Sequence, residues 1–93
     1  MPVAIETSEA AILSRVIRAE VAEWSKEAAE SILDFDFPPA DLRRMNALAA
    51  TARAGNLSAD EEAELDNYRD VGRLLELLQS KARLSLKKSA AAN

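Results

Sequence analysis

The feature that most constrains the fold is a long helical stretch over residues 57–88, LSADEEAELDNYRDVGRLLELLQSKARLSLKK. The hydroxyl of Ser58 can accept a hydrogen bond from an unpaired amide of the first turn. Glu61, three residues later, can reach back to the amide of Ser58, as in a capping box. The sequence therefore predicts a helix that begins after Ser58 and continues to about residue 86.

One side of this predicted helix is apolar. Its members follow one another at spacings of three or four residues, which is the period of a helical face: Leu65, Tyr68, Val71, Leu75, Leu78 and Ala82. The helix would be roughly 42 Å long at the usual rise per residue, whereas a compact domain of this size has a radius of gyration of about 12 Å. Another long helix, a second copy or a partner must therefore cover part of it. We take the following residues as the candidate interaction seam: Leu65, Tyr68, Val71, Leu75 and Leu78.

The same helix ends in basic residues, which favour the negative end of the helix dipole. Four cations fall near one side and form a candidate basic stripe: Arg69, Arg73, Lys81 and Lys88. Residues 1–68 carry six Lys and Arg against fourteen Asp and Glu, whereas residues 69–93 carry six against two. The acidic part opposes the approach of phosphates. Contact with nucleic acid is therefore expected only through the basic end.

A second amphipathic pattern predicts a helix over residues 8–33, with Thr7 or Ser8 as its cap. Its apolar residues recur at spacings of three or four: Leu13, Ile17, Val21, Trp24, Ala28 and Ile32. Trp24 is either a core residue or an exposed anchor for a partner. The opposite face carries Glu20, Glu23, Glu27 and Glu30. These glutamates indicate a solvated face rather than a cation site, because di-iron bundles pair such residues with histidine and the chain has none.

The two predicted long helices are separated by DFDFPP at residues 34–39. Two prolines cannot continue a helix, but Pro39 suits the first turn of a new one. Phe35 and Phe37 either plug the end of the bundle or form a short docking motif. A shorter helix is expected over residues 39–54, ending at Gly55, which suits the left-handed C-cap conformation.

These elements predict an all-α fold with three helices, of which the first and third are long and the middle one is short. We expect a single helical domain over residues 1–93, with a disordered lead at 1–7 and a disordered tail at 89–93. Apolar residues make up 48% of the chain, but many are alanines, so the core is expected to be thin. A thin core favours oligomerisation or partner binding, and assembly as a dimer is one such arrangement.

Catalysis is not expected. The chain has no cysteine and no histidine, and its two glycines cannot build a phosphate-binding loop. Thiol chemistry, the usual zinc sites and histidine-assisted nucleophiles are therefore excluded, and no cofactor is expected. The sequence has neither the features of a secretory signal nor an apolar stretch long enough to span a membrane. A cytoplasmic location is therefore expected.

The pattern of cap, Tyr-x-x-Val-Gly-x-Leu-Leu at residues 68–75 and Ser-Lys-Ala-Arg at 80–83 resembles a small bacterial family of all-helical proteins with no established activity. The resemblance covers about residues 32–88 and includes FPPADLRRMNALAATARAG at 37–55. It implies no catalytic residues. Because some members are similar to products encoded beside nuclease-like proteins, it implies an antitoxin-like or accessory role.

Two functional hypotheses follow. The first is a small non-catalytic module that binds itself or another protein through its apolar helix face. The second is a regulator that contacts nucleic acid through the basic end of the last helix, where Arg83 and Lys87 would join the stripe. Few aromatic residues and no recognisable nucleic-acid-binding motif accompany these cations, so the first hypothesis is preferred.

Overall fold

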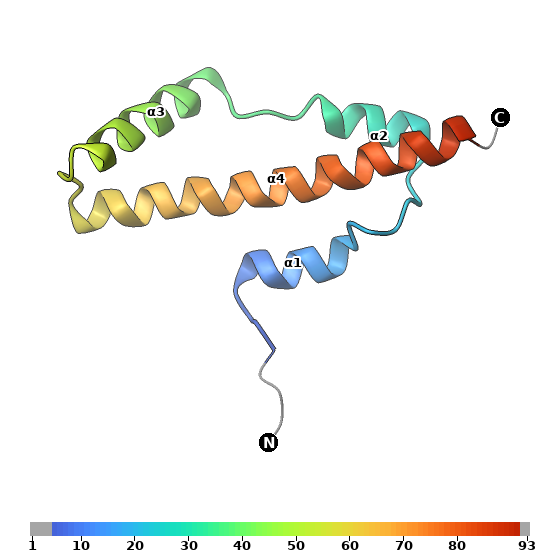
Figure 1. Ribbon diagram of the computed structural model, residues 1–93, viewed down its shortest axis with the longest axis horizontal. Coiled ribbons are helices and arrows are strands. Elements are labelled where there is room, and N and C mark those ends of the chain that lie inside the picture. Colours follow the sequence, from blue (N-terminus) through green and yellow to red (C-terminus); the bar gives the residue numbers. More distant parts are fainter. Residues whose placement is uncertain (1–4, 92–93) are drawn as a thin grey trace. The chain divides into compact units, whose positions relative to one another are not determined.

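The computed structural model describes residues 5–91 (Figure 1). All regular structure within this range is helical: α1 (Glu9–Ile17), α2 (Lys26–Leu33), α3 (Pro39–Arg53) and α4 (Ala59–Ala91). The prediction of an all-α fold is therefore confirmed. None of the helices within residues 5–91 combines the length and the apolar character that crossing a membrane requires.

Contacts divide the chain into two compact units that share α4. The first unit comprises Met1–Phe35 and Arg73–Asn93, and the second comprises Asp36–Gly72. The expectation that residues 1–93 act as a single domain stays a prediction. α4 continues to Ala91, so residues 89–91 of the expected tail are helical. Residues 5–7 of the expected lead form no helix, and the remainder of the lead and tail, at 1–4 and 92–93, lies outside the described residues.

The prediction of three helices is wrong, because the expected helix at 8–33 is two helices separated by residues 18–25. Arg18 ends α1 in the left-handed conformation, with φ at 53°. The linker sequence RAEVAEWS contains neither glycine nor proline, but its last residue, Ser25, caps α2 by accepting from the amide of Ala28. Two side chains of α4 also bond the backbone at the break: Lys81 donates to the carbonyl of Ile17, and Ser85 accepts from the amide of Trp24.

The predicted helix starts are confirmed. Ser8 accepts a hydrogen bond from the amide of Ala11 at 3.2 Å, which caps α1. At the start of α4, the Ser58 hydroxyl accepts from the Glu61 amide at 3.1 Å, and the Glu61 carboxylate accepts from the Ser58 amide at 3.0 Å. This reciprocal pair is the capping box that the sequence predicts.

The connection between α3 and α4 is fixed by the end of α3. Pro39 occupies the first helical position, and the helix ends one residue before the expected boundary. The amide of Gly55 donates to the carbonyl of Ala52, and the amide of Asn56 donates to that of Thr51. With Gly55 at φ 74°, these bonds form a Schellman motif. The chain then enters α4 through residues 56–58, so α3 and the start of α4 form a helical hairpin with a short connection.

The two glycines are expected to respond in opposite directions to alanine substitution. A Cβ at either position would meet no atom within 4 Å, so only backbone preference counts. Gly55→Ala is expected to lower the free energy of unfolding by about 1 kcal/mol, because alanine resists the left-handed conformation. Gly72→Ala, inside α4, is expected to raise it by about 0.5–1 kcal/mol. Urea denaturation followed by circular dichroism measures both, and the same sign for both would contradict the backbone assignment.

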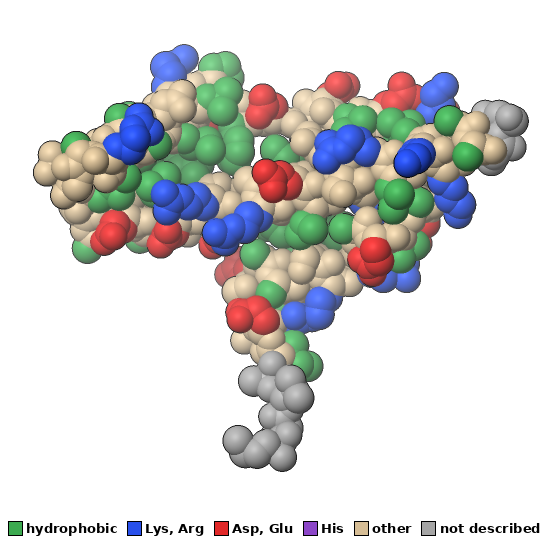
Figure 2. All heavy atoms as spheres, in the orientation of Figure 1, with side chains coloured by type: hydrophobic (Ala, Val, Ile, Leu, Met, Phe, Trp, Pro, Cys, Tyr) green, Lys and Arg blue, Asp and Glu red, His purple; other side chains and the backbone are tan. Residues whose placement is uncertain are grey.

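The core is thin. The buried apolar side chains among the described residues are Ala29, Leu48, Leu65 and Ala82. Several large apolar side chains remain exposed instead: Ile5, Ile12, Leu13, Val16, Phe35, Leu42, Val71 and Leu84. Figure 2 shows apolar side chains at the surface between charged ones. The described residues therefore have the thin core that the alanine-rich composition predicts.

Candidate interaction surfaces

The second unit is a hairpin of α3 and the first half of α4, held by polar and aromatic contacts. The guanidinium of Arg44 donates two hydrogen bonds to the carboxylate of Glu64, one of them at 2.8 Å. The hydroxyl of Tyr68 donates to Asp41 at 2.7 Å. The ring of Phe37 meets that of Tyr68 edge to face, with centroids 6.1 Å apart. These contacts order α3 against α4.

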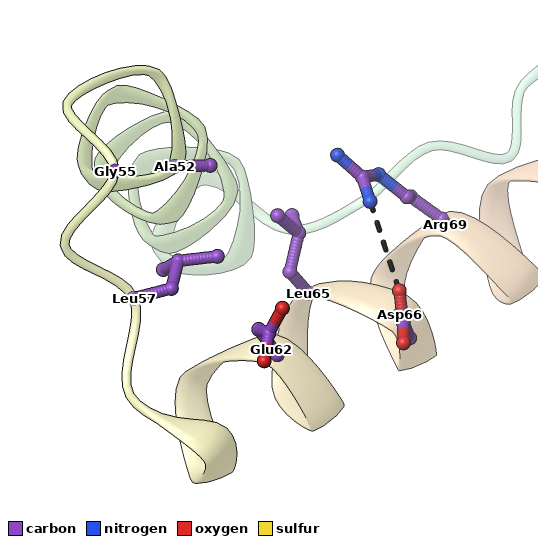
Figure 3. A pocket seen from close by; sticks show the side chains of 7 residues that line it. All are labelled: Ala52, Gly55, Leu57, Glu62, Leu65, Asp66 and Arg69. Carbon is purple, nitrogen blue, oxygen red and sulfur yellow. Dashed lines mark ion pairs between the residues drawn. The ribbon is translucent and has the colours of Figure 1, made fainter.

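A pocket of about 310 Å³ lies in this hairpin (Figure 3). Leu57 and Leu65 reach into the space between the end of α3 and α4, while Glu62 lies at its edge. Arg69 and Asp66 form an ion pair at 3.6 Å on the same side. The lining is completed by Ala52 and Gly55. Leu57 and Leu65 supply apolar side chains to the pocket, whereas Glu62, Asp66 and Arg69 supply charged ones.

The five residues of the candidate interaction seam are not presented together. Leu65 is buried, and Tyr68 is half-buried by its contacts with Phe37 and Asp41. Leu75 and Leu78 are half-buried in the first unit. Val71 is 50% exposed. Part of the candidate interaction seam therefore packs inside the hairpin. The role of the seam as a binding surface stays a prediction.

The two phenylalanines also differ. Phe37 packs on Tyr68, which agrees with its interpretation as a hydrophobic plug. Phe35 is 54% exposed, and its carbonyl accepts a hydrogen bond from the side chain of Gln79 at 2.9 Å. The backbone of this segment is therefore fixed while the ring of Phe35 remains open to solvent.

Lys81 does not belong to an exposed basic stripe. Lys81 is only 1% exposed. Its ammonium donates to the carbonyl of Ile17 and to the carboxylate of Glu23, both at 2.6 Å. The same ammonium lies 4.8 Å from the centre of the Trp24 ring. The seven-residue step from Lys81 to Lys88 places both near one side of a helix, but the pattern alone does not show that residues 18–25 fold over Lys81.

The other members of the stripe are exposed, in different surroundings. Arg69 lies in the second unit and pairs with Asp66. Arg73 and Lys88 belong to the first unit. Arg73 and Arg83 line a hollow on α4 together with Glu76, Leu77 and Ser80. Because Lys81 is buried, fewer cations of the candidate basic stripe are exposed than the sequence pattern indicates.

The ion pairs shift the ionisation of two glutamates. A hydrogen bond from Lys81, opposed by partial burial and aided by Arg18, holds the pKa of Glu23 below its ordinary value of 4.5. A hydrogen bond from Arg44, again opposed by partial burial, lowers the pKa of Glu64. The hydrogen bond to Asp41 and burial raise the pKa of Tyr68 above its ordinary value of 10.0. All three shifts favour the ionisation states that make the observed contacts.

Stability is therefore expected to fall at both extremes of pH. A carboxyl whose pKa is lowered by folding stabilises the protein above its unfolded pKa, near 4.5, and loses that contribution as the pH falls through the folded value. A tyrosine whose pKa is raised stabilises the protein below pH 10.0 and loses that contribution as the pH rises through the folded value. Urea midpoints measured across pH test this. Glu23→Gln should flatten the acid limb and Tyr68→Phe the alkaline limb; a limb unchanged by its substitution would refute that assignment.

Three large apolar side chains of α1 are exposed, and one of them, Val16, is the most exposed large apolar side chain within a described helix. Ile12, Leu13 and Val16 are 44%, 42% and 70% exposed, and no residue of α1 is buried. Ile12 and Val16 are four residues apart and share a face. In the sequence they widen the apolar pattern of residues 8–33, but periodicity does not reveal that they stay uncovered. An exposed apolar face on a short helix is an arrangement that fits a protein partner.

The acidic face expected over residues 20–30 is not a single helix face. Glu20 and Glu23 lie in the linker between α1 and α2, whereas Glu27 and Glu30 lie on α2. Within residues 5–91, no group of three or more His, Cys, Asp or Glu side chains is placed to hold a metal ion.

Comparison with known proteins adds no relative. The chain matches no protein-family model, no curated protein and no solved structure. The resemblance to the small bacterial helical family therefore stays an expectation.

Proposed function

We propose that this chain is a small non-catalytic helical module that binds another protein through the exposed apolar face of α1. The observation that carries the proposal is the exposure of Ile12, Leu13 and Val16 on one helix that buries none of its own residues. An antitoxin-like or accessory regulator would act in this way, by occupying a surface of its target. The cytoplasm, expected from the sequence, is part of the proposal.

The energetics favour a partner with an apolar groove. Burying a large aliphatic side chain is worth about 1.5–3 kcal/mol, and Ile12 and Val16 supply two such side chains on one face. An amphipathic helix that places its apolar residues in a groove is a recurring mode of protein recognition. A second copy of this chain can also provide such a groove, which would make the module a dimer.

Affinity capture from the native lysate tests the proposal. The bait is the full chain, compared with an Ile12→Ser/Val16→Ser variant, and each capture is repeated after nuclease treatment. The expected result is a specific protein that the wild-type bait retains after nuclease treatment and that the variant loses. Equal recovery by both baits would refute the role of α1. Sedimentation at increasing protein concentration identifies self-association as the alternative outcome.

Nucleic-acid contact through α4 is the second candidate function. The observation that favours it is the pair of arginines, Arg73 and Arg83, in a hollow that Glu76, Leu77 and Ser80 also line. Lys87 and Lys88 are exposed further along the helix. Binding through these cations should weaken with salt, with a logarithmic slope of roughly −0.7 to −0.9 for each phosphate neutralised. Recovery that disappears after nuclease treatment would favour this function, whereas no binding at low salt would remove it.

A further inference from the structure

The break between α1 and α2 is built from contacts within residues 18–25 and from contacts with α4. Residues 18–25 contain only amino acids that a helix accepts, and an apolar pattern passes through them from Leu13 to Ile32. The chain nevertheless places Arg18 at φ 53°, a conformation that side-chain-bearing residues adopt at a cost. Within the segment, Arg18 donates two hydrogen bonds to the carboxylate of Glu23, at 2.9 and 3.0 Å, and side chains of α4 supply further contacts.

The backbone hydrogen bonds show what holds it. In a continuous helix, the carbonyl of Ile17 would accept from the amide of Val21, and the amide of Trp24 would donate four residues back. Instead, the amide of Val21 donates to the carbonyl of Arg18 at 3.0 Å. The ammonium of Lys81 donates to the carbonyl of Ile17 at 2.6 Å, and the hydroxyl of Ser85 accepts from the amide of Trp24 at 3.2 Å. Two side chains of α4 thus replace backbone partners that the helix would otherwise supply.

The environment of Lys81 fits only the broken arrangement. Its buried ammonium is compensated by the carbonyl of Ile17, the carboxylate of Glu23 and the face of Trp24. If residues 18–25 became helical, the Ile17 carbonyl would bond Val21 and the ammonium would lose this partner. A buried cation without partners is unfavourable, so Lys81 opposes the continuous helix.

We propose that residues 8–33 have a second arrangement, a single continuous helix, and that Lys81 and Ser85 form a latch that holds the broken one. The register of α2 separates the two states. In the broken state Ala29 is fully buried and Ala28 is exposed. In a continuous helix Ala28 would join Leu13 and Ile17 on the apolar face. Conversion would therefore change which side of α2 is aligned with the apolar face of α1.

The latch would regulate the proposed binding surface. A continuous helix over residues 8–33 would be roughly 39 Å long and would extend the apolar face of α1 past the present break. A partner that prefers this longer face would have to displace Lys81. This use rests on the proposed function, whereas the conformational change itself requires no partner and is tested without one.

Lys81→Met in the full chain is the primary test, because methionine retains an apolar stem but cannot donate. The measurement is the set of ¹³Cα chemical shifts of residues 18–25 by NMR, together with amide exchange. We expect non-helical shifts in the wild type and helical shifts with slower exchange in the variant. Lys87→Met, at an exposed position of α4, is the matched control and should resemble the wild type. Random-coil or wild-type shifts at 18–25 in a folded Lys81→Met protein would overturn the proposal.

Ser25→Ala provides the second test should the loss of Lys81 prevent folding. Ser25 caps α2 by accepting from the amide of Ala28 at 3.2 Å, so its removal weakens the broken state alone while leaving Lys81 in place. Shifts of residues 18–25 are expected to move toward helical values. No movement in this variant, with Lys81→Met unfolded or unchanged, would also overturn the latch. Failure of the capture experiment, by contrast, would leave these NMR results as they are.

Discussion

Leu48→Ala is expected to lower the free energy of unfolding by about 2–5 kcal/mol, the usual range for a buried leucine truncated to alanine. Leu48 is 1% exposed and is the largest fully buried apolar side chain among the described residues. It lies on α3, which packs in the hairpin of the second unit. Because small domains are stable by only about 5–15 kcal/mol in total, this single change should remove a large share of the stability.

Leu42→Ala is the matched control for Leu48. It makes the same chemical change on the same helix, but Leu42 is 38% exposed. Its expected effect is no more than about 1 kcal/mol, because less apolar surface is removed from the interior. Urea denaturation followed by far-UV circular dichroism compares the two. Equal losses would contradict the packing of α3 described here.

Ile12→Ser/Val16→Ser is expected to weaken binding to the captured partner by at least about 30-fold, since two apolar anchors would be lost. Both side chains are exposed in the free chain, so the substitution should leave the circular dichroism spectrum and the urea midpoint nearly unchanged. Isothermal titration calorimetry measures the affinity. Loss of affinity without loss of stability separates a binding role from a role in the core.

Val71→Ser provides the comparison with the candidate interaction seam. Val71 is the most exposed member of that seam, at 50%, and lies in the second unit rather than the first. If α1 carries the interaction, Val71→Ser should change the affinity by less than about threefold, as expected for a side chain outside the contact. A larger loss from Val71→Ser than from the α1 variant would transfer the binding surface to α4.

Local signals in the sequence predicted much of this fold. Ser58 with Glu61, Pro39 at the start of α3 and Gly55 at its end are all features whose physics acts over a few residues. The structure confirms each of them. The break at residues 18–25 was not predicted in this way, because several of its contacts come from about sixty residues away, in Lys81 and Ser85. Periodicity identifies a helix but does not reveal a side chain that competes for its backbone.

The same distinction applies to the candidate surfaces. The spacing of Leu65, Tyr68 and Val71 correctly places them on α4, but their exposure depends on which of them α3 covers. Lys81 has the charge of a surface residue and is nevertheless buried. Ile12 and Val16 have the character of core residues and are exposed. Burial depends on tertiary packing, which composition and period do not specify.

Site-specific photocrosslinking at position 16 tests the central claim most directly. A photoreactive amino acid replaces Val16, the most exposed residue of the α1 face, and in a matched protein it replaces Ser31, an exposed residue of α2. After irradiation in the native lysate, the account predicts one specific protein covalently joined at position 16 and not at position 31. Equal labelling at both positions, or labelling of nucleic acid alone, would contradict it.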